Sequence, residues 1–132
     1  MKDSQLIILQ KDMDLLSQHL QKAVLSDFNR KKLLLELHHA RVVPLEKLPY
    51  DAVALNSFVE VLDLVSKQKF SFTLVAPAEA NLKKNRISVF APMGIALLGY
   101  LVGAEVQWEM PGGLKSFKIL KVVQNAIEQQ VE

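Results

Sequence analysis

The sequence predicts an α+β fold: an N-terminal antiparallel helical hairpin followed by a β domain of about five strands with one short helix. Two observations lead to this expectation. Up to residue 41, apolar residues recur every third or fourth position, which is typical of amphipathic helices. From residue 52 onward, apolar and polar residues alternate in short segments separated by turns rich in Gly, Pro or Lys, which is typical of strands.

The first predicted helix covers residues 4–24 and carries a heptad-like apolar seam: Leu6, Leu9, Met13, Leu16, Leu20 and Ala23. Residues 28–41 resume the helical period and place three leucines toward that seam: Leu33, Leu34 and Leu37. Between the helices, either Ser26 or Asp27 can accept the free backbone amides that begin the second helix. Helices joined by so short a link are expected to lie antiparallel, with the seam between them.

The β domain is expected to follow a stiff linker between Pro44 and Pro49, which has room for one short helical turn. Strands are predicted at residues 52–64, 70–75, 86–89, 105–110 and 115–123. Pro92 starts a short helix that Gly99 closes, and Pro111-Gly112-Gly113 is a hairpin connection. The predicted organisation is therefore a hairpin over 1–42, a β domain over 43–127 and a tail over 128–132.

The composition excludes several classes of protein. The chain has 132 residues and a net charge of only +2, from 16 basic and 14 acidic residues, so a dominant nucleic-acid footprint is not expected. The absence of cysteine excludes a disulfide scaffold and any cysteine-based metal or redox site. The sequence contains neither an apolar run of membrane-spanning length nor a signal-peptide pattern, so a soluble cytoplasmic protein without membrane association is expected.

Three sequence blocks occur in an order that points to a known family. They are ISVFAPMGIALLG at Ile87–Gly99, VGAEV at Val102–Val106, and the Pro-Gly-Gly turn. In this order they resemble the C-terminal domain shared by the bacterial Gre transcript-cleavage factors and the Rnk-type regulators of nucleoside diphosphate kinase. The segment Leu48–Val61 is similar to the first strand of that domain. The resemblance implies an FKBP-like β domain that carries an N-terminal coiled-coil arm.

The resemblance also bears on catalysis. Gre factors cleave transcripts with two acidic residues at the arm tip, which help to hold a second Mg²⁺ in the polymerase active centre. In residues 25–32 the only carboxylate is Asp27, and the basic residues Arg30, Lys31 and Lys32 follow it. A basic run repels the ion that this chemistry needs, so Asp27 is expected to cap a helix. We therefore expect no enzymatic activity, no bound metal and no cofactor, as in the Rnk type with its shorter arm.

The resemblance implies a partner-binding loop as well. Residues Phe90, Ala91, Pro92, Met93 and Gly94 correspond to the loop that docks on the rim of the secondary channel of RNA polymerase. Two interpretations of Phe90 stay open, an exposed apolar anchor or a ring packed under the short helix. The basic arm tip also has two interpretations, a solvated helix end or a surface drawn to an acidic or phosphate-lined passage.

The function that the resemblance implies is a transcription regulator that binds RNA polymerase at the secondary channel and competes with Gre factors. The alternatives are a genuine transcript-cleavage factor and a protein-interaction module that dimerises through the hairpin. A monomer or weak dimer is expected, without sequence-specific DNA binding, because no recognition helix with base-reading side chains is evident. His19, His38 and His39 lack metal-site spacing and are expected to be surface or packing residues.

Overall fold

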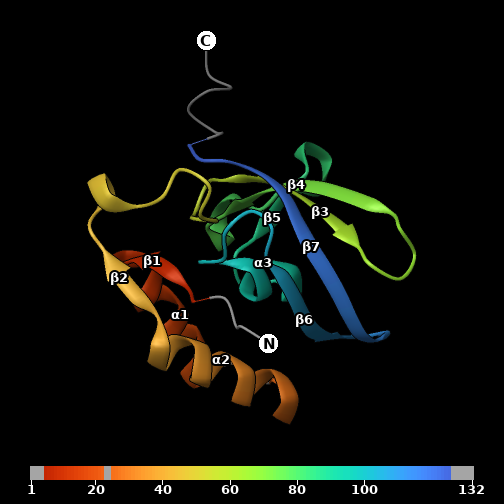
Figure 1. Ribbon diagram of the computed structural model, residues 1–132, viewed down its shortest axis with the longest axis horizontal. Coiled ribbons are helices and arrows are strands. Elements are labelled where there is room, and N and C mark those ends of the chain that lie inside the picture. The colour runs from red at the N-terminus through yellow and green to blue at the C-terminus, as the bar shows by residue number, and fades with distance from the viewer. Residues whose placement is uncertain (1–4, 23–24, 126–132) are drawn as a thin grey trace.

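A five-stranded sheet in the order β5-β4-β3-β7-β6 forms the centre of the structure (Figure 1), a computed structural model that describes residues 5–22 and 25–125. The elements are β3 (Phe58–Asp63), β4 (Lys69–Val75), β5 (Arg86–Ser88), α3 (Pro92–Leu97), β6 (Glu105–Met110) and β7 (Gly113–Val123). Neighbouring strands pair antiparallel, except that β4 and β5 are parallel. The α+β class and a sheet of five strands are thereby confirmed.

Alternation of side chains decides which face of each strand is buried. In β6, Val106 and Trp108 are buried while Glu105, Gln107 and Glu109 are exposed. The same alternation along β3 and β7 turns one face of the sheet inward, so the predicted periodicity and the turn at residues 111–113 are confirmed.

The predicted strand at 52–64 is wrong over its first half. Residues before Phe58 form turns, in which the Ser57 side chain accepts a hydrogen bond from the Ala54 backbone N–H at 3.0 Å. Asn56 adopts a left-handed conformation with φ of 70°, which interrupts an extended chain. Local Asn-Ser turn chemistry therefore overrides the alternating pattern.

The N-terminal segment contains β1 (Ile7–Leu9), α1 (Gln10–Lys22), α2 (Asp27–His39) and β2 (Arg41–Val43), followed by a 3-10 turn at Leu45–Lys47. The helix predicted from residue 4 is thus wrong at Ile7–Leu9, which pairs in parallel with Arg41–Val43. Both segments contain adjacent β-branched residues that favour extended backbone, and the pairing supplies backbone hydrogen bonds that the helical period does not reveal. Residues 4, 23 and 24 lie outside the described residues.

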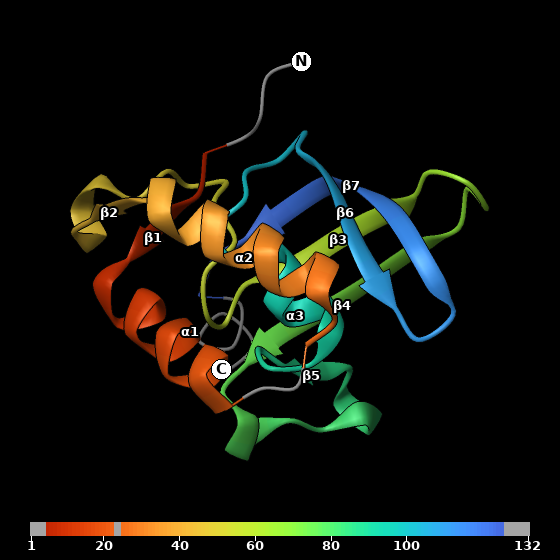
Figure 2. The same ribbon diagram turned by 90° about the horizontal axis from the view of Figure 1, so that it is seen from below.

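A single hydrophobic core joins the N-terminal segment to the sheet. Five of its buried residues come from that segment: Leu6, Ile8, Leu16, Leu20 and Leu33. They share a cluster with Val59, Leu97 and Trp108 of the β domain. In the two views α3 lies between the N-terminal helices and the sheet, and α1 and α2 run in roughly opposite directions (Figure 2).

The predicted apolar seam is only partly correct. Leu9 is half-buried while its neighbour Ile8 is buried, and Leu34 is 48% exposed, so neither Leu9 nor Leu34 takes the expected central position. The reason is that the helices pack on the β domain as well as toward each other, and strand β1 reverses the side chains near the N-terminus. The predicted tail at 128–132 lies outside the described residues.

Candidate partner-binding groove

The predicted docking loop begins where β5 ends. The Phe90 backbone N–H donates to Ser88 Oγ at 3.0 Å, and the Ala91 N–H donates to the Ser88 carbonyl oxygen at 2.9 Å. Pro92 then occupies the first turn of α3, where its fixed φ suits a helix start. These bonds hold the loop in one tight turn with Pro92 exposed.

Gly94 has a packing role rather than an exposed contact surface. It is buried, and a Cβ atom added there would lie 2.6 Å from the Ser88 carbonyl oxygen. Glycine is needed because α3 approaches the end of β5 too closely for any side chain. The contact roles of Phe90, Ala91, Pro92 and Met93 remain predictions.

Phe90 stacks on a histidine from the N-terminal segment. The ring centroids of His19 and Phe90 lie 4.0 Å apart with an interplanar angle of 7°. Phe90 is half-buried and also packs against the core, so it is neither a free anchor nor a fully covered core residue. The sequence predicts His19, on α1, only as a surface or packing residue. The stack joins two rings 71 positions apart, and a local sequence pattern does not reveal such a tertiary contact.

Partial burial shifts the pKa of the His19 imidazole. Desolvation lowers the pKa of His19 from its ordinary value of 6.5. The lowered pKa favours the neutral imidazole in its stack on Phe90.

A second tertiary contact joins α2 to the sheet edge. Asn29 Nδ2 donates to the Glu109 carbonyl oxygen at 2.8 Å, and the Glu109 backbone N–H donates to Asn29 Oδ1 at 2.8 Å. Asn29 is 5% exposed, so this amide is a buried, satisfied polar group at the edge strand β6.

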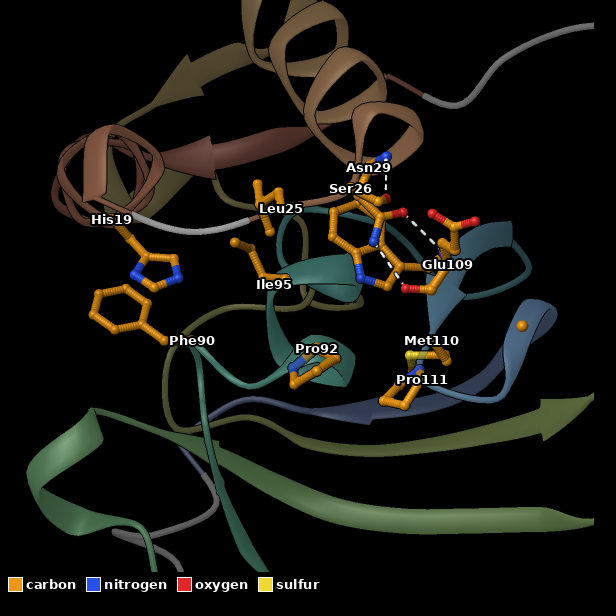
Figure 3. A pocket seen from close by; sticks show the side chains of 12 residues that line it. His19, Leu25, Ser26, Asn29, Phe90, Pro92, Ile95, Glu109, Met110 and Pro111 are labelled. Atoms are coloured by element: carbon orange, nitrogen blue, oxygen red, sulfur yellow. Dashed lines mark hydrogen bonds between the residues drawn. The ribbon is translucent and has the colours of Figure 1, made fainter.

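These contacts enclose a groove of about 620 Å³ (Figure 3). His19 comes from α1, Leu25 precedes α2, Asn29 lies on α2, and the loop and α3 supply Phe90, Pro92 and Ile95. The β6–β7 hairpin completes the lining with Trp108, Glu109, Met110, Pro111 and Gly113. The groove thus brings the predicted docking loop beside the junction of the N-terminal helices.

The predicted arm-tip residues do not act as a group. Of the two predicted caps, Ser26 is the N-cap, because its Oγ accepts the Asn29 backbone N–H at 3.1 Å. Asp27 is exposed in the first turn of α2, where a carboxylate favours the helix dipole. The prediction of a cap at Ser26 or Asp27 is therefore confirmed at Ser26, and the narrower expectation that Asp27 is the cap is wrong.

The three basic residues at the tip have different surroundings. Arg30 Nη1 donates to the Leu20 carbonyl oxygen at 3.4 Å, near the end of α1. Lys32 pairs with Glu36 and donates to the Tyr100 hydroxyl at 2.9 Å, while Lys31 is exposed. The positive field expected from a basic run is thereby reduced at Lys32, whose charge is paired.

Within 5–22 and 25–125, no three His, Asp or Glu side chains converge as metal ligands would. In the same part of the chain, no helix is both long and apolar enough to cross a membrane.

The sheet order, the short helix after β5 and the tight loop between them define an α+β domain. The family "Transcription elongation factor, GreA/GreB, C-term" matches residues 48–124. The chain belongs to this family.

Two relatives show the extent of the sequence similarity. The chain is 40% identical over 79 residues to the Regulator of nucleoside diphosphate kinase of Escherichia coli (strain K12), covering 60% of this chain and 58% of that protein. It is 31% identical over 102 residues to Transcription elongation factor GreA of Aliarcobacter butzleri (strain RM4018), covering 77% of this chain and 63% of that protein. These matches thus span less than two thirds of either relative.

A solved structure extends the likeness to the fold. The prokaryotic transcription elongation factor GreA/GreB from Nitrosomonas europaea matches with a TM-score of 0.67 and 33% identity, covering 90% of this chain and 98% of that one. This similarity includes the N-terminal segment, which the family match at 48–124 leaves out.

Proposed function

We propose that this protein is a transcription regulator that binds RNA polymerase at the rim of the secondary channel, does not cleave transcripts, and competes with Gre factors. Family membership supports the polymerase as partner. The observation that supports the absence of transcript cleavage lies between α1 and α2. There a single exposed carboxylate, Asp27, precedes Arg30 and Lys31 on helices that pack into the β-domain core.

The residue content around Asp27 supports the absence of Mg²⁺ recruitment in this proposal. A hydrated Mg²⁺ is held by converging oxygen ligands, and one exposed carboxylate supplies too few. Residues 23–32, AVLSDFNRKK, contain no second acidic residue. Each helix has 13 residues and so is ~20 Å long.

Two assays test this function. Core RNA polymerase is titrated with the protein, and a Gre factor is then added as competitor; we expect saturable binding that the Gre factor displaces. Backtracked elongation complexes are incubated with Mg²⁺ and the protein; we expect no shortening of the RNA beyond the intrinsic rate of the polymerase. Metal-dependent cleavage that Asp27→Asn abolishes would support the alternative, a genuine cleavage factor.

One observation favours a second candidate function, self-association through the helices. The outer surface of α2 exposes Leu34 and Leu35, at 48% and 58%. Isolated apolar side chains are common on surfaces, but two adjacent leucines on one helix fit an interface between copies. Sedimentation equilibrium distinguishes the two candidates: a stable dimer that Leu35→Lys dissociates would favour the interaction module.

A further inference from the structure

A second groove, of about 940 Å³, lies between the second half of α2 and the first half of β6, an edge strand of the sheet. The two elements lie beside each other (Figure 2), and Asn29 connects them at Glu109. Leu35 lines this groove from α2, and Glu105 and Gln107 line it from β6. We call it the edge groove. It is separate from the groove at the docking loop, which Leu35, Glu105 and Gln107 do not line.

Backbone polar groups of β6 point away from the sheet along the edge groove. The Glu109 N–H and carbonyl oxygen face outward, since both bond to Asn29. Every second residue of an antiparallel strand directs its N–H and C=O to the same side, so those of Gln107 and Glu105 also face outward. Ser116, the cross-strand partner of Gln107, supports this direction. Its carbonyl oxygen accepts a backbone N–H from the turn after β3 at 2.9 Å, on the side away from β6.

The contact at Asn29 shows which kind of group this edge accepts. The Asn29 amide offers one donor and one acceptor to Glu109, as a neighbouring strand would. A ligand that continues this pairing at Gln107 and Glu105 needs donors and acceptors that repeat at strand spacing, ~7 Å between successive outward residues. An extended peptide has this arrangement. The edge groove therefore suits an added strand.

Side chains around the edge favour particular residues in such a strand. Val106 is 1% exposed at the bottom of the edge groove, and Leu35 on α2 is 58% exposed beside it. Glu105 and Gln107 alternate with Val106 and so lie on the other face of β6. Side chains of an added strand alternate in the same way. One set packs against Leu35, and the other lies next to Glu105.

The Lys and Glu side chains of the edge groove have one negative charge in excess. Lys32 forms an ion pair with Glu36, and the Tyr100 hydroxyl contacts both. Tyr100 is 3% exposed, so this pair is held against the core. Glu105 is exposed at the groove, and no ion pair involves it within the described part of the chain. A cation on the ligand is therefore complementary to Glu105.

A second copy of this chain fits the edge less well than a peptide of other sequence. Twofold pairing of β6 centred at Gln107 places Glu105 opposite the partner's Glu109, and centring at Glu105 places it opposite the partner's Glu105. Like charges directly opposite each other destabilise a sheet. Asn29 also occupies the outward groups of Glu109 already. The occupant is therefore a segment of a different protein.

We propose that the edge groove binds an extended, basic segment of a partner protein as a sixth strand beside β6. The backbone of the segment pairs with Gln107 and Glu105. Its Lys or Arg side chains lie next to Glu105, and the apolar side chains between them pack on Leu35. Asn29 sets one end of the added strand, because Glu109 is already paired. This site is independent of the proposed polymerase contact.

Peptides of defined sequence test the proposal by NMR on the ¹⁵N-labelled full chain. The probe is acetyl-TKVKVT-amide, in which Lys alternates with Val, and acetyl-TEVEVT-amide is the control for charge. We expect the probe to shift the amide resonances of Glu105 and Gln107 saturably and to slow their hydrogen exchange about tenfold, because both amides gain a partner. The acidic peptide is expected to bind at least about fivefold more weakly.

Two further forms of the probe test strand pairing itself. One is N-methylated at both Lys residues and the other at both Val residues. Successive residues of a strand direct their N–H groups to opposite sides, so only one of these two sets faces β6. We expect one form to lose binding and the other to keep it. Equal binding by the two forms would overturn strand addition.

Variants of the protein test the side-chain contacts. Leu35→Ala is expected to weaken binding of the probe about fivefold. Leu34→Ala is the matched control, because Leu34 is 48% exposed on the same helix but does not line the edge groove. Glu105→Lys is expected to reverse the preference between the basic and acidic peptides, while Glu109→Lys, the same charge change outside this groove, preserves it. Spectra of the free variants identify any loss that comes from unfolding.

Three results would overturn the proposal. The first is the absence of saturable shifts up to about 1 mM probe. The second is a set of shifts that centres on Phe90 and α3 and leaves Glu105 and Gln107 unchanged. The third is equal weakening by Leu35→Ala and Leu34→Ala. The assay contains no polymerase, so none of these results bears on the proposed function, and failure to bind polymerase leaves the edge groove unaffected.

Discussion

Asn29 and Glu109 lie 80 residues apart and pair as two neighbouring strands would, through one donor and one acceptor on each side. The Asn29 amide supplies both groups to β6, an edge strand of the sheet. Free edges expose unpaired backbone groups that can pair with other chains. A helix side chain thus completes part of the sheet edge and connects α2 to it.

Asn29→Ala is expected to lower the free energy of unfolding by about 1–3 kcal/mol, because two backbone groups of a part-buried strand lose their partners. Urea denaturation measures the change. Lys31→Ala, an exposed position on the same helix, serves as control and should stay within about 0.5 kcal/mol. A loss equal to that control would contradict the structural role of the amide.

Leu16→Ala is expected to cost about 2–5 kcal/mol, because Leu16 is 0% exposed in the core that α1 shares with the sheet. Leu35→Ala, at 58% exposure on α2, is the matched control and should have little effect on stability. Thermal unfolding followed by Trp108 fluorescence provides the measurement, since Trp108 lies in the same core cluster. If the Trp108 transition keeps its midpoint in Leu16→Ala, the N-terminal segment folds independently and the single core is refuted.

Gly94→Ala is expected to destabilise the protein by about 1–3 kcal/mol or more, because the new methyl group meets the Ser88 carbonyl oxygen at 2.6 Å. Gly112→Ala is the control, since a Cβ there has no heavy atom within 4 Å. The melting temperatures of the two variants are compared. Equal melting temperatures would mean that α3 shifts away from β5 without cost.

Asp12→Asn is expected to raise the melting temperature at pH 7.5 and to have a smaller effect at pH 4. Asp12 is 1% exposed, and its Oδ1 has no hydrogen-bond partner among the described residues. Burial is the main cause that raises the pKa of Asp12 above its ordinary value of 3.8, with the Leu55 backbone N–H lowering it in part.

The sign of the Asp12 effect follows from proton binding. Between its ordinary pKa and its raised pKa, the folded state holds the proton more often than the unfolded state, so stability decreases as pH rises through this interval. Above the interval the ionised, buried carboxylate destabilises the fold, and an amide of the same shape removes that charge. Melting temperatures are recorded from pH 4 to pH 8 for both proteins. A parallel pH dependence in Asp12→Asn would exclude Asp12 as the cause.

Much of the β domain is predictable from local sequence. The alternation in 105–110, the turn at Pro111-Gly112-Gly113 and the helix start at Pro92 each depend on residues within a few positions of one another. Turn chemistry and side-chain periodicity are properties of such short segments. The docking role of residues 90–93 comes from the family resemblance and stays a prediction.

In the N-terminal segment, local sequence does not predict the backbone structure correctly. Leucines at helical spacing predicted a helix through Ile7–Leu9, but the structure pairs these residues with Arg41–Val43. The partner strand lies more than 30 positions away, and a strand is stabilised by its pairing more than by its own residues. Periodicity in one segment does not contain that information.

The amino-acid sequence by itself determined the α+β class, most strands of the sheet, the tight turns and membership of the Gre and Rnk group, because these depend on local patterns. Only the tertiary structure decided that His19 stacks on Phe90, that Asn29 pairs with Glu109, and that one groove lies between these contacts. The physical reason is that such contacts arise when packing brings distant segments together, and their geometry depends on the whole core.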